Sequence, residues 1–388
     1  MVVVVLNFVT QRKESHSPLF SHVTSPYIFC MDMRTLAEIK AEAQNSPLEA
    51  VAHVQLEASV VKTGRNGKPF AELRFQDGTD RLTLRIFDDN PVFSEIPALE
   101  DGSFLALKGV FFRNGDYGID IRKLSVRRLE DEERAALLGG SSGVREKQAR
   151  DIEDIRSLAA AIVDPRLHTV VQLFLNEFGE RFARSAGARF VHHARRGGLV
   201  EHTAQMMRTA AAVAAVYPVL NRDLLLAGTL LHDAGKMWEN HVPPDSFVMP
   251  VDERGELLGH ISIGFELVNT LWRKMQGNFE DWKKLEPSTE QVRSHLLHLI
   301  ASHHGTYEFG SPVLPKTPEA VALNAIDNLD ARLEIFLQGY ATLPLVAPRI
   351  HDKVRILNHY LVKPLPAFEL PPEPGKNASS EIGVETEK

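Results

Sequence analysis

Cysteine is nearly absent from this sequence, since Cys30 is the only one among 388 residues. A lone cysteine cannot form an internal disulfide, and Cys30 lies outside every motif discussed below. We therefore expect an intracellular, cytoplasmic protein that folds without disulfides and uses no thiolate as a metal ligand.

Long hydrophobic runs are also missing. The apolar stretch Met1–Val9 is far shorter than the roughly 20 residues that span a bilayer. No basic residue precedes it and no small-residue cleavage site follows it, so it lacks the features of a secretion signal. We expect neither a membrane span nor an exported protein.

An excess of positive charge is missing as well. The chain has 44 Lys and Arg residues against 51 Asp and Glu residues, a net charge of −7. This balance excludes a uniformly basic surface but leaves room for a local basic face that binds nucleic acid. With 44% hydrophobic and 24% charged residues, the composition is that of a globular protein with two or three domains.

The first residues have no periodicity that joins them to the rest of the chain. By contrast, Leu36 and Ile39 begin a helical pattern directly after Met31 and Met33. We interpret residues 1–32 as a non-native or disordered extension and expect translation to start at one of these two methionines. The intact mass of the native protein would test this expectation.

Residues 33–130 show one short helix followed by the alternation that is typical of half-buried strands. Leu82, Leu84 and Ile86, for example, alternate with polar residues. Turn signals separate the expected strands, at Gly64–Gly67, Asp77-Gly78 and Asn114-Gly115. About five short strands fit a small β-barrel of the OB-fold type, with a small sandwich as the alternative.

Residues 131–150 have a different composition. The charged run Glu130–Arg134 is followed by Gly139–Gly143, a glycine and serine segment that is typical of a flexible connection. We place a linker and the domain boundary here.

The remainder of the chain has a helical pattern from residue 151 to about residue 365, with apolar residues three and four positions apart. Residues 366–388 are rich in Pro, Glu and Ser, which predicts a disordered tail. The expected fold class is thus multidomain α and β, with a small N-terminal β-barrel followed by an all-α domain over residues 151–365.

Histidines and aspartates recur at the ends and inner faces of the expected helices: His202, His232, Asp233, His260, His303, His304 and Asp327. Mixed nitrogen and carboxylate ligands suit borderline divalent metals such as Mn, Fe, Co, Ni or Zn. Adjacent side chains on a helix diverge by about 100°, so His232 and Asp233 can share an ion only near a helix end or beside a cavity. Each residue alone has a structural explanation, whereas the ordered set favours a metal site.

The order His202, His232-Asp233, Asp327 resembles that of the HD-domain metal-dependent phosphohydrolases, over residues 151–362. The additional histidines resemble the subset that holds two metals. Longer phrases are most similar to the YhaM-type 3′-5′ exoribonucleases, which also carry an N-terminal OB-fold that binds nucleic acid. These phrases are His192–Ala194, Gly197–Thr203, Leu231–Lys236, Ser302–Gly305 and Ile326–Asp330.

The resemblance implies a primary site of His202, His232, Asp233 and Asp327. It also implies that Asp233 bridges to a second ion held by His260 and by His303 or His304. In the family the first histidine of this pair is the usual ligand, which favours His303 and leaves His304 as an outer or substrate contact. One or two ions are implied, with Mn expected and Co, Fe or Ni as alternatives.

The implied chemistry needs no protein nucleophile, because two cations that share a water lower its pKa and bind the phosphate oxygens. The expected catalytic residues are Asp233 and Lys236, the latter pairing with a nonbridging phosphate oxygen unless it is a solvated surface lysine. His193 and Arg195 are candidates for phosphate contact or, with equal weight, for structural roles.

A second group of candidates lies on the alternating strands. Arg74, Arg81 and Arg85 fall opposite the apolar core positions, and Phe70 and Phe87 share their phase. OB-folds hold single strands with such a positive groove and aromatic platforms. Interspersed acidic residues leave a solvated polar face as the alternative.

The predicted function is therefore metal-dependent 3′-5′ hydrolysis of single-stranded RNA, or of DNA, to 5′-mononucleotides. One alternative is an HD phosphohydrolase that acts on small nucleotides, which would not need a strand-binding half. The other is a non-catalytic nucleic-acid-binding protein, which would have no physical reason to keep carboxylates that repel one another together with unpaired imidazoles. Homo-oligomers are compatible with the sequence, which does not specify them.

Overall fold

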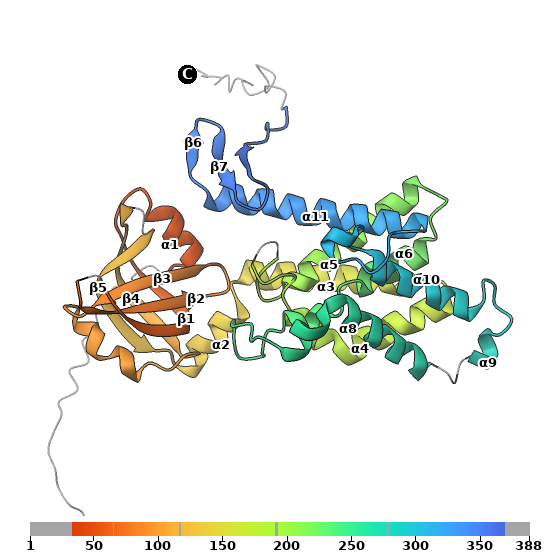
Figure 1. Ribbon diagram of the computed structural model, residues 1–388, viewed down its shortest axis with the longest axis horizontal. Coiled ribbons are helices and arrows are strands. Elements are labelled where there is room, and N and C mark those ends of the chain that lie inside the picture. The colour runs from red at the N-terminus through yellow and green to blue at the C-terminus, as the bar shows by residue number, and fades with distance from the viewer. Residues whose placement is uncertain are drawn as a thin grey trace, which may run out of the picture.

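The computed structural model describes residues 33–64, 66–115, 118–190, 193–275, 277 and 279–368. A β-sheet region occupies one end of the molecule and a helical region the other (Figure 1). The expectations about residues 1–32 and 369–388, which include Cys30 and a start at Met31, lie outside the described residues, as does His192.

The sheet region is a five-stranded antiparallel sheet with the order β3-β2-β1-β4-β5. Its elements are α1 (Leu36–Glu42), β1 (Leu48–Thr63), β2 (Pro69–Gln76), β3 (Arg81–Phe87), β4 (Phe104–Arg113) and β5 (Ile119–Arg128). The predicted alternation is confirmed in β3, where Leu82, Leu84 and Ile86 are buried between exposed neighbours. β3 and β5 approach each other, but no hydrogen-bonded ladder joins them among the described strands, so a closed barrel is not shown.

Residues 131–150 form one helix and the start of a second, separated only by Gly140-Ser141, so the expected flexible character of this segment is wrong. Helix α2 (Asp131–Gly139) has three acidic residues in its first turn, and α3 (Ser142–Ala160) begins after Ser141, whose side chain accepts a hydrogen bond from Val144 N. Acidic residues stabilise a helix N-terminus and serine caps one, so this segment encodes a helix boundary. Helix caps and flexible linkers share glycine and serine, so a pair of capping residues was interpreted as a linker.

The helical region follows α3, and each long helical pattern of the sequence corresponds to an observed helix. Its further elements are α4 (Pro165–Arg184), α5 (Gly198–Val216), α6 (Arg222–Leu231), α7 (Lys236–Glu239), α8 (Glu253–Lys274), α9 (Phe279–Trp282), α10 (Thr289–Ser302) and α11 (Pro318–Thr342). Helix α6 is buried along its length from Leu224 to Leu231. In the described part of the chain, no helix has the length and apolar character needed to cross a membrane.

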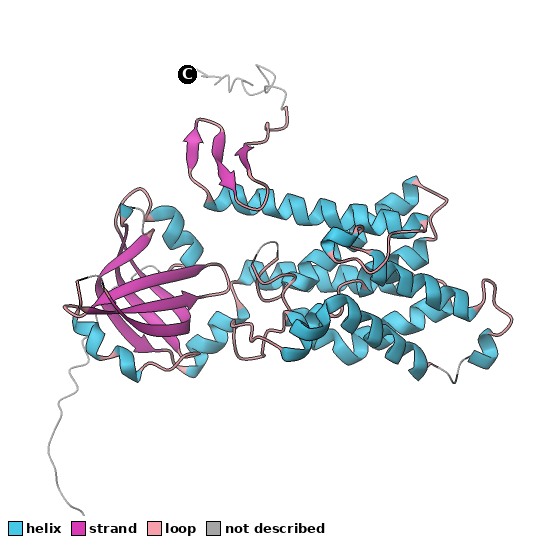
Figure 2. Ribbon diagram, viewed as in Figure 1, coloured by secondary structure: helices cyan, strands magenta, loops and turns pink. Residues whose placement is uncertain are grey.

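The expectation that the helical pattern continues to residue 365 is wrong at its end. A three-stranded antiparallel sheet of β6 (Leu345–Ala347), β7 (Ile350–Val354) and β8 (His359–Val362) stands on the end of α11 (Figure 2). Pro344 and Pro348 cannot continue a helix, and Leu361 packs closely against Gly339 of α11.

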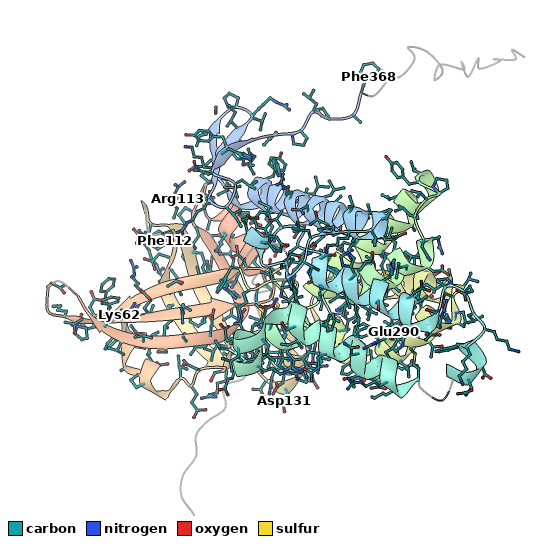
Figure 3. The ribbon with its side chains drawn as sticks, turned by 45° about the vertical axis from the view of Figure 1, so that its right-hand side comes forward. Lys62, Phe112, Arg113, Asp131, Glu290 and Phe368 are labelled. Atoms are coloured by element: carbon teal, nitrogen blue, oxygen red, sulfur yellow. The ribbon has the colours of Figure 1, made fainter. Side chains whose placement is uncertain are left out.

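The segment between α7 and α8 connects the helical region to the sheet. Phe247 N donates to Gln55 Oε1 at 2.8 Å, and the Phe247 ring lies 6.4 Å from the Phe104 ring. A methyl group on Gly78 would lie 2.8 Å from the Phe247 ring, so the β2–β3 turn also packs here. The far end of the sheet, where Lys62 lies, projects away from the helices (Figure 3).

Candidate metal centre

Side chains from five helices, or from the residues just beyond their ends, converge in the helical region. His202 belongs to α5, His232 and Asp233 follow α6, His260 lies in α8, His303 and His304 follow α10, and Asp327 lies in α11. The structure therefore brings together all seven residues that the sequence suggested as ligands. His202, His232, Asp233 and His303 are at most 2% exposed.

One cluster surrounds the Nε2 atom of His202. This atom lies 3.4 Å from His232 Nε2, 3.4 Å from Asp327 Oδ1 and 3.5 Å from Asp233 Oδ2. Two atoms that each lie about 2.1 Å from one ion at a tetrahedral angle are ~3.4 Å apart. The ligand atoms of His202, His232 and Asp327 all lie within 4.8 Å of one another, which fits a shared cation, and Asp233 lies beside them.

A second cluster begins at the other oxygen of Asp233. Asp233 Oδ1 lies 3.6 Å from both His260 Nε2 and His303 Nε2, and His260 Nε2 lies 3.3 Å from His304 Nε2. Asp233 Oδ1 and His303 Nε2 are buried without a hydrogen-bond partner among the described residues. Orphaned buried polar atoms are rare, and a cation would satisfy both. Asp233 thus faces two clusters, and both His303 and His304 reach the second.

The five imidazoles share one orientation with respect to the centre. Each Nδ1 meets an oxygen acceptor at 2.7 or 2.8 Å: Asp330 Oδ2 for His202, Thr229 O for His232, Glu239 Oε2 for His260, Ile300 O for His303 and Phe309 O for His304. A ring that donates from Nδ1 keeps the lone pair of Nε2 free. All five Nε2 atoms therefore face the two clusters, and each offers its lone pair to a cation when its ring is neutral.

The charges of the centre favour cation binding. Burial opposes ionisation of Asp233, but Lys236, whose Nζ lies 2.6 Å from Asp233 Oδ2, and His232 hold the pKa of this carboxyl well below its usual value. Burial alone would lower the pKa of His202, yet hydrogen bonds to Asp233 and Asp330 raise it to about 9 in the metal-free protein. Burial lowers the pKa of His303, which keeps that ring neutral.

Two glycines bring the ligand-bearing segments into contact. A methyl group on Gly235 would lie 1.9 Å from His260 O, so only glycine lets the turn after Asp233 lie directly against α8. A methyl group on Gly198 would lie 2.0 Å from His193 O, where the preceding loop crosses the start of α5. The glycines that accompany the histidine motifs thus have a packing role.

A cleft of about 500 Å³ opens over the centre, a volume in the range of small-ligand sites. Lys236, His260, His304 and Asp327 line it. A phosphate group in this cleft would reach the ligand clusters from outside.

Comparison with known proteins agrees with this geometry. The HD domain family model matches residues 199–332. The 3′-5′ exoribonuclease YhaM of Geobacillus sp. (strain WCH70) is 30% identical over 271 residues, which cover 70% of this chain and 78% of that protein. The chain belongs to the YhaM family of HD-domain proteins. The YhaM protein of Bacillus velezensis is 29% identical over 278 residues, 72% of this chain and 83% of its own length.

Membership in this family indicates a hydrolase, and both the HD domain and the His/Asp clusters indicate a divalent metal centre. Among solved structures, the aspartyl-tRNA synthetase of Entamoeba histolytica matches 55% of this chain and 50% of its own, at 13% identity and a TM-score of 0.19. So low a TM-score carries no argument about the fold.

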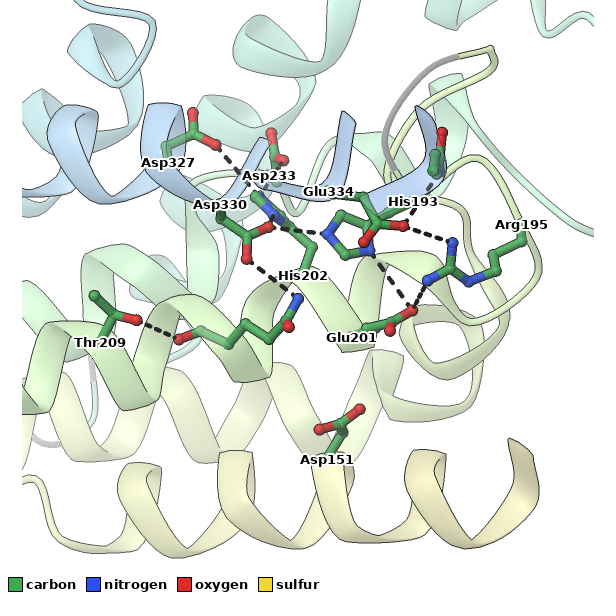
Figure 4. Close-up of polar contacts among 12 residues, drawn as sticks. Asp151, His193, Arg195, Glu201, His202, Thr209, Asp233, Asp327, Asp330 and Glu334 are labelled. Carbon is green, nitrogen blue, oxygen red and sulfur yellow. Dashed lines mark hydrogen bonds and ion pairs between the residues drawn. The ribbon is translucent and has the colours of Figure 1, made fainter. Parts of the chain in front are cut away.

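The structure adds residues that the sequence analysis of this YhaM-family chain missed. Asp330 Oδ2 lies 2.7 Å from His202 Nδ1 and 2.9 Å from His193 Nε2 (Figure 4). Glu239 orients His260 in the same way. Asp330 lies three residues after Asp327 on α11, a spacing that places both on one helix face and was the available signal.

Two predicted phosphate contacts lie elsewhere than expected. His193 is fully buried behind His202 and is held by Asp330, so it does not reach the cleft, and of its two expected roles the structural one fits this position. Arg195 forms ion pairs with Glu201 and Glu334, the latter at 2.9 Å, and lies in a second cleft, between the sheet and the helices. Its charge is therefore largely compensated.

The candidate strand-binding residues share one face of the sheet, as expected. Arg74, Arg81, Arg85 and Phe87 are exposed, and the rings of Phe70 and Phe87 lie 5.7 Å apart. Two of the arginines lie near carboxylates: Arg85 is 3.5 Å from Glu72, which also binds Lys62, and Arg81 is 3.9 Å from Glu57. This face is thus less positive than its arginines alone suggest.

Proposed function

We propose that this protein is a metal-dependent 3′-5′ exoribonuclease that hydrolyses single-stranded RNA, or DNA, to 5′-mononucleotides. The observation that carries the proposal is the common orientation of the five imidazoles around the two oxygens of Asp233. The names of the YhaM relatives support the direction of hydrolysis and the RNA substrate.

In this proposal His202, His232, Asp233 and Asp327 hold one divalent cation. His260, His303 and the second oxygen of Asp233 hold another, with His304 beside it. When bound, the cations lower the pKa of water and offset the negative charge of the phosphate. Mn²⁺ is the expected ion, because borderline metals accept this mixture of imidazole and carboxylate.

Lys236 is the residue that we assign to the substrate phosphate. Burial would lower the pKa of Lys236, but Asp233 and Asp327 raise it, so the side chain stays protonated at neutral pH. It lines the cleft at the start of α7, where its ammonium, paired with Asp233 at 2.6 Å, also has donors for a nonbridging oxygen. Attack by water on phosphorus then breaks the bond to the 3′-oxygen of the preceding ribose, which takes up a proton.

We also propose that the five-stranded sheet acts as an OB-fold that captures the strand. Its strand order would become that of a small closed barrel if β3 and β5 were paired. The tilted rings of Phe70 and Phe87, and Arg74 farther along the same face, offer stacking and charge to single-stranded bases.

Product analysis with 5′-labelled single-stranded RNA tests the proposal. We expect a ladder that shortens from the 3′ end, release of 5′-mononucleotides, and dependence on an added divalent ion with Mn²⁺ among the best. Phosphate release from mononucleotides with an intact oligomer would instead indicate a small-nucleotide phosphohydrolase. Binding of RNA without turnover under every metal would indicate a non-catalytic binding protein.

A further inference from the structure

Two clefts of the molecule share a wall. The first opens over the metal centre, and the second, of about 360 Å³, lies between the sheet and the helical region. Gly78 and Arg81 line the second cleft from the sheet, and Arg196 lines it from the helical side. Arg189 and Phe190, in the loop between α4 and α5, line both clefts. A strand that runs from the sheet to the metal centre would therefore pass these two residues.

The side chain of Phe190 is 79% exposed although it lines both clefts. Because Phe190 lines both clefts, its exposed ring offers an apolar face where the two clefts meet. Every nucleobase has a flat π-face, so a ring in this position can stack on a base regardless of sequence.

The arginines that flank Phe190 are anchored without losing their charge. Arg189 Nη2 donates to Glu239 O at 2.9 Å and to Pro250 O at 2.8 Å, and Arg196 donates to Pro243 O at 2.7 Å and to Pro244 O at 3.0 Å. Within the described residues, neither guanidinium has a carboxylate within 4.0 Å. Carbonyl anchors fix the position of a cation but do not neutralise it, which suits contact with phosphates.

The acidic residues of the two clefts are mostly engaged elsewhere. Glu239 binds His260 Nδ1 at 2.7 Å, and Asp80 binds Lys40 at 2.8 Å. Glu256 is exposed at the rim of the first cleft. Among the described residues Arg189 and Arg196 form no close ion pair, although Asp245 acts on Arg196 from farther away, so both supply positive charge at the passage between the clefts.

We propose that Phe190 is the stacking platform for one base of a single-stranded nucleic acid at the passage between the two clefts, while Arg189 and Arg196 hold the adjoining phosphates. The proposal rests on the proposed function for the direction of the strand, but the platform itself is a binding site that can be measured without catalysis.

The test measures binding of a 5′-fluorescein oligoribonucleotide to the Asp233→Asn variant, which removes turnover. Phe190→Ala should weaken binding about 5- to 100-fold, and Phe190→Trp should retain it and show quenched tryptophan fluorescence when RNA binds. Tyr217→Ala is the matched control, because Tyr217 is 58% exposed and follows the far end of α5. It should leave the Kd unchanged.

An abasic scan locates the base. Removing one particular base near the 3′ end should weaken binding to the Phe190 protein but not to the Phe190→Ala protein, since both changes delete the same contact. Equal Kd values for Phe190→Ala and Tyr217→Ala, or additive losses at every abasic position, would show that Phe190 does not stack on a base. Absence of RNA hydrolysis by the wild-type protein would overturn the proposed function alone, because the binding assay would still decide the platform.

Discussion

The metal centre and the exposed face of the sheet differ in how their polar groups are held. In the centre, each imidazole is fixed by an oxygen partner at Nδ1, and the ligands are buried between five helices. On the sheet, Arg81 and Arg85 are exposed and lie 3.9 and 3.5 Å from carboxylates. The first arrangement is rigid and specific, whereas the second can adapt to many sequences. Substitutions should therefore have all-or-none effects in the centre and graded effects on the sheet.

The largest effect is expected for Asp233→Asn. The amide keeps the shape of the side chain but removes the charge that faces both clusters, so hydrolysis should fall to the level of a protein-free control. Initial rates on labelled RNA measure this effect. Asp154→Asn, which removes an exposed carboxylate paired with Arg208, is the control and should keep full activity. Normal turnover by Asp233→Asn would remove this residue from the mechanism.

A smaller effect is expected for Asp330→Asn. This change weakens the hydrogen bond that orients the His202 ring, but it leaves every residue of the two clusters in place. Partners that orient a metal-binding histidine typically contribute about 10- to 100-fold to metal affinity or activity. The concentration of Mn²⁺ needed for half-maximal rate should rise by this factor, with partial recovery at high Mn²⁺. An unchanged metal dependence would show that the contact between His202 and Asp330 has no positioning role.

The pH dependence of metal binding should follow His202. Its pKa of about 9 in the metal-free protein is raised above the unfolded value, so the stability gained from the bound proton is present below pH 6.5 and is lost as pH rises through 9. A metal must displace this proton, so its apparent affinity should fall about tenfold per pH unit below 9. Calorimetry in buffers of different ionisation enthalpy would detect the released proton. Binding without proton release would contradict the account.

The smallest effect is expected on the sheet. Nearby carboxylates partly compensate the charges of Arg81 and Arg85. Replacing both arginines with alanine should therefore raise the apparent KM for long strands only several-fold, with little change for dinucleotides. Alanine at Arg145 and Arg150 of α3, which lie outside both clefts, provides a control with the same charge change. Equal effects on long and short substrates would show that this face of the sheet does not capture the strand.

The convergence of the candidate ligands was predictable from the sequence because their residue types follow a local pattern. His232 and Asp233 follow a helix as predicted, since His232 is the C-cap of α6, and Gly259 interrupts α8 directly before His260. The partners of the imidazoles had no such pattern, apart from the three-residue spacing between Asp327 and Asp330. Asp330 meets His202 across 128 residues of chain, and Glu239 reaches His260 from a separate short helix, so no spacing rule connects them.

The fold was predictable where a periodic pattern of apolar residues extends over a long segment. It was ambiguous where the segments are short. The alternation of β3 and the helical patterns are strong signals. The errors occurred at Gly140-Ser141, where capping residues resemble a linker, and at β6 to β8, where strands of three to five residues are too short to show a period. Burial of His193 depends on how the loop before α5 packs, which no local pattern reveals.

The most direct test of the central claim is anomalous diffraction from crystals of the protein soaked in Mn²⁺. The account predicts a peak between His202, His232, Asp233 and Asp327, and a second one between Asp233, His260 and His303. Anomalous density that is absent from these side chains, in crystals whose solution enzyme is active with Mn²⁺, would contradict it.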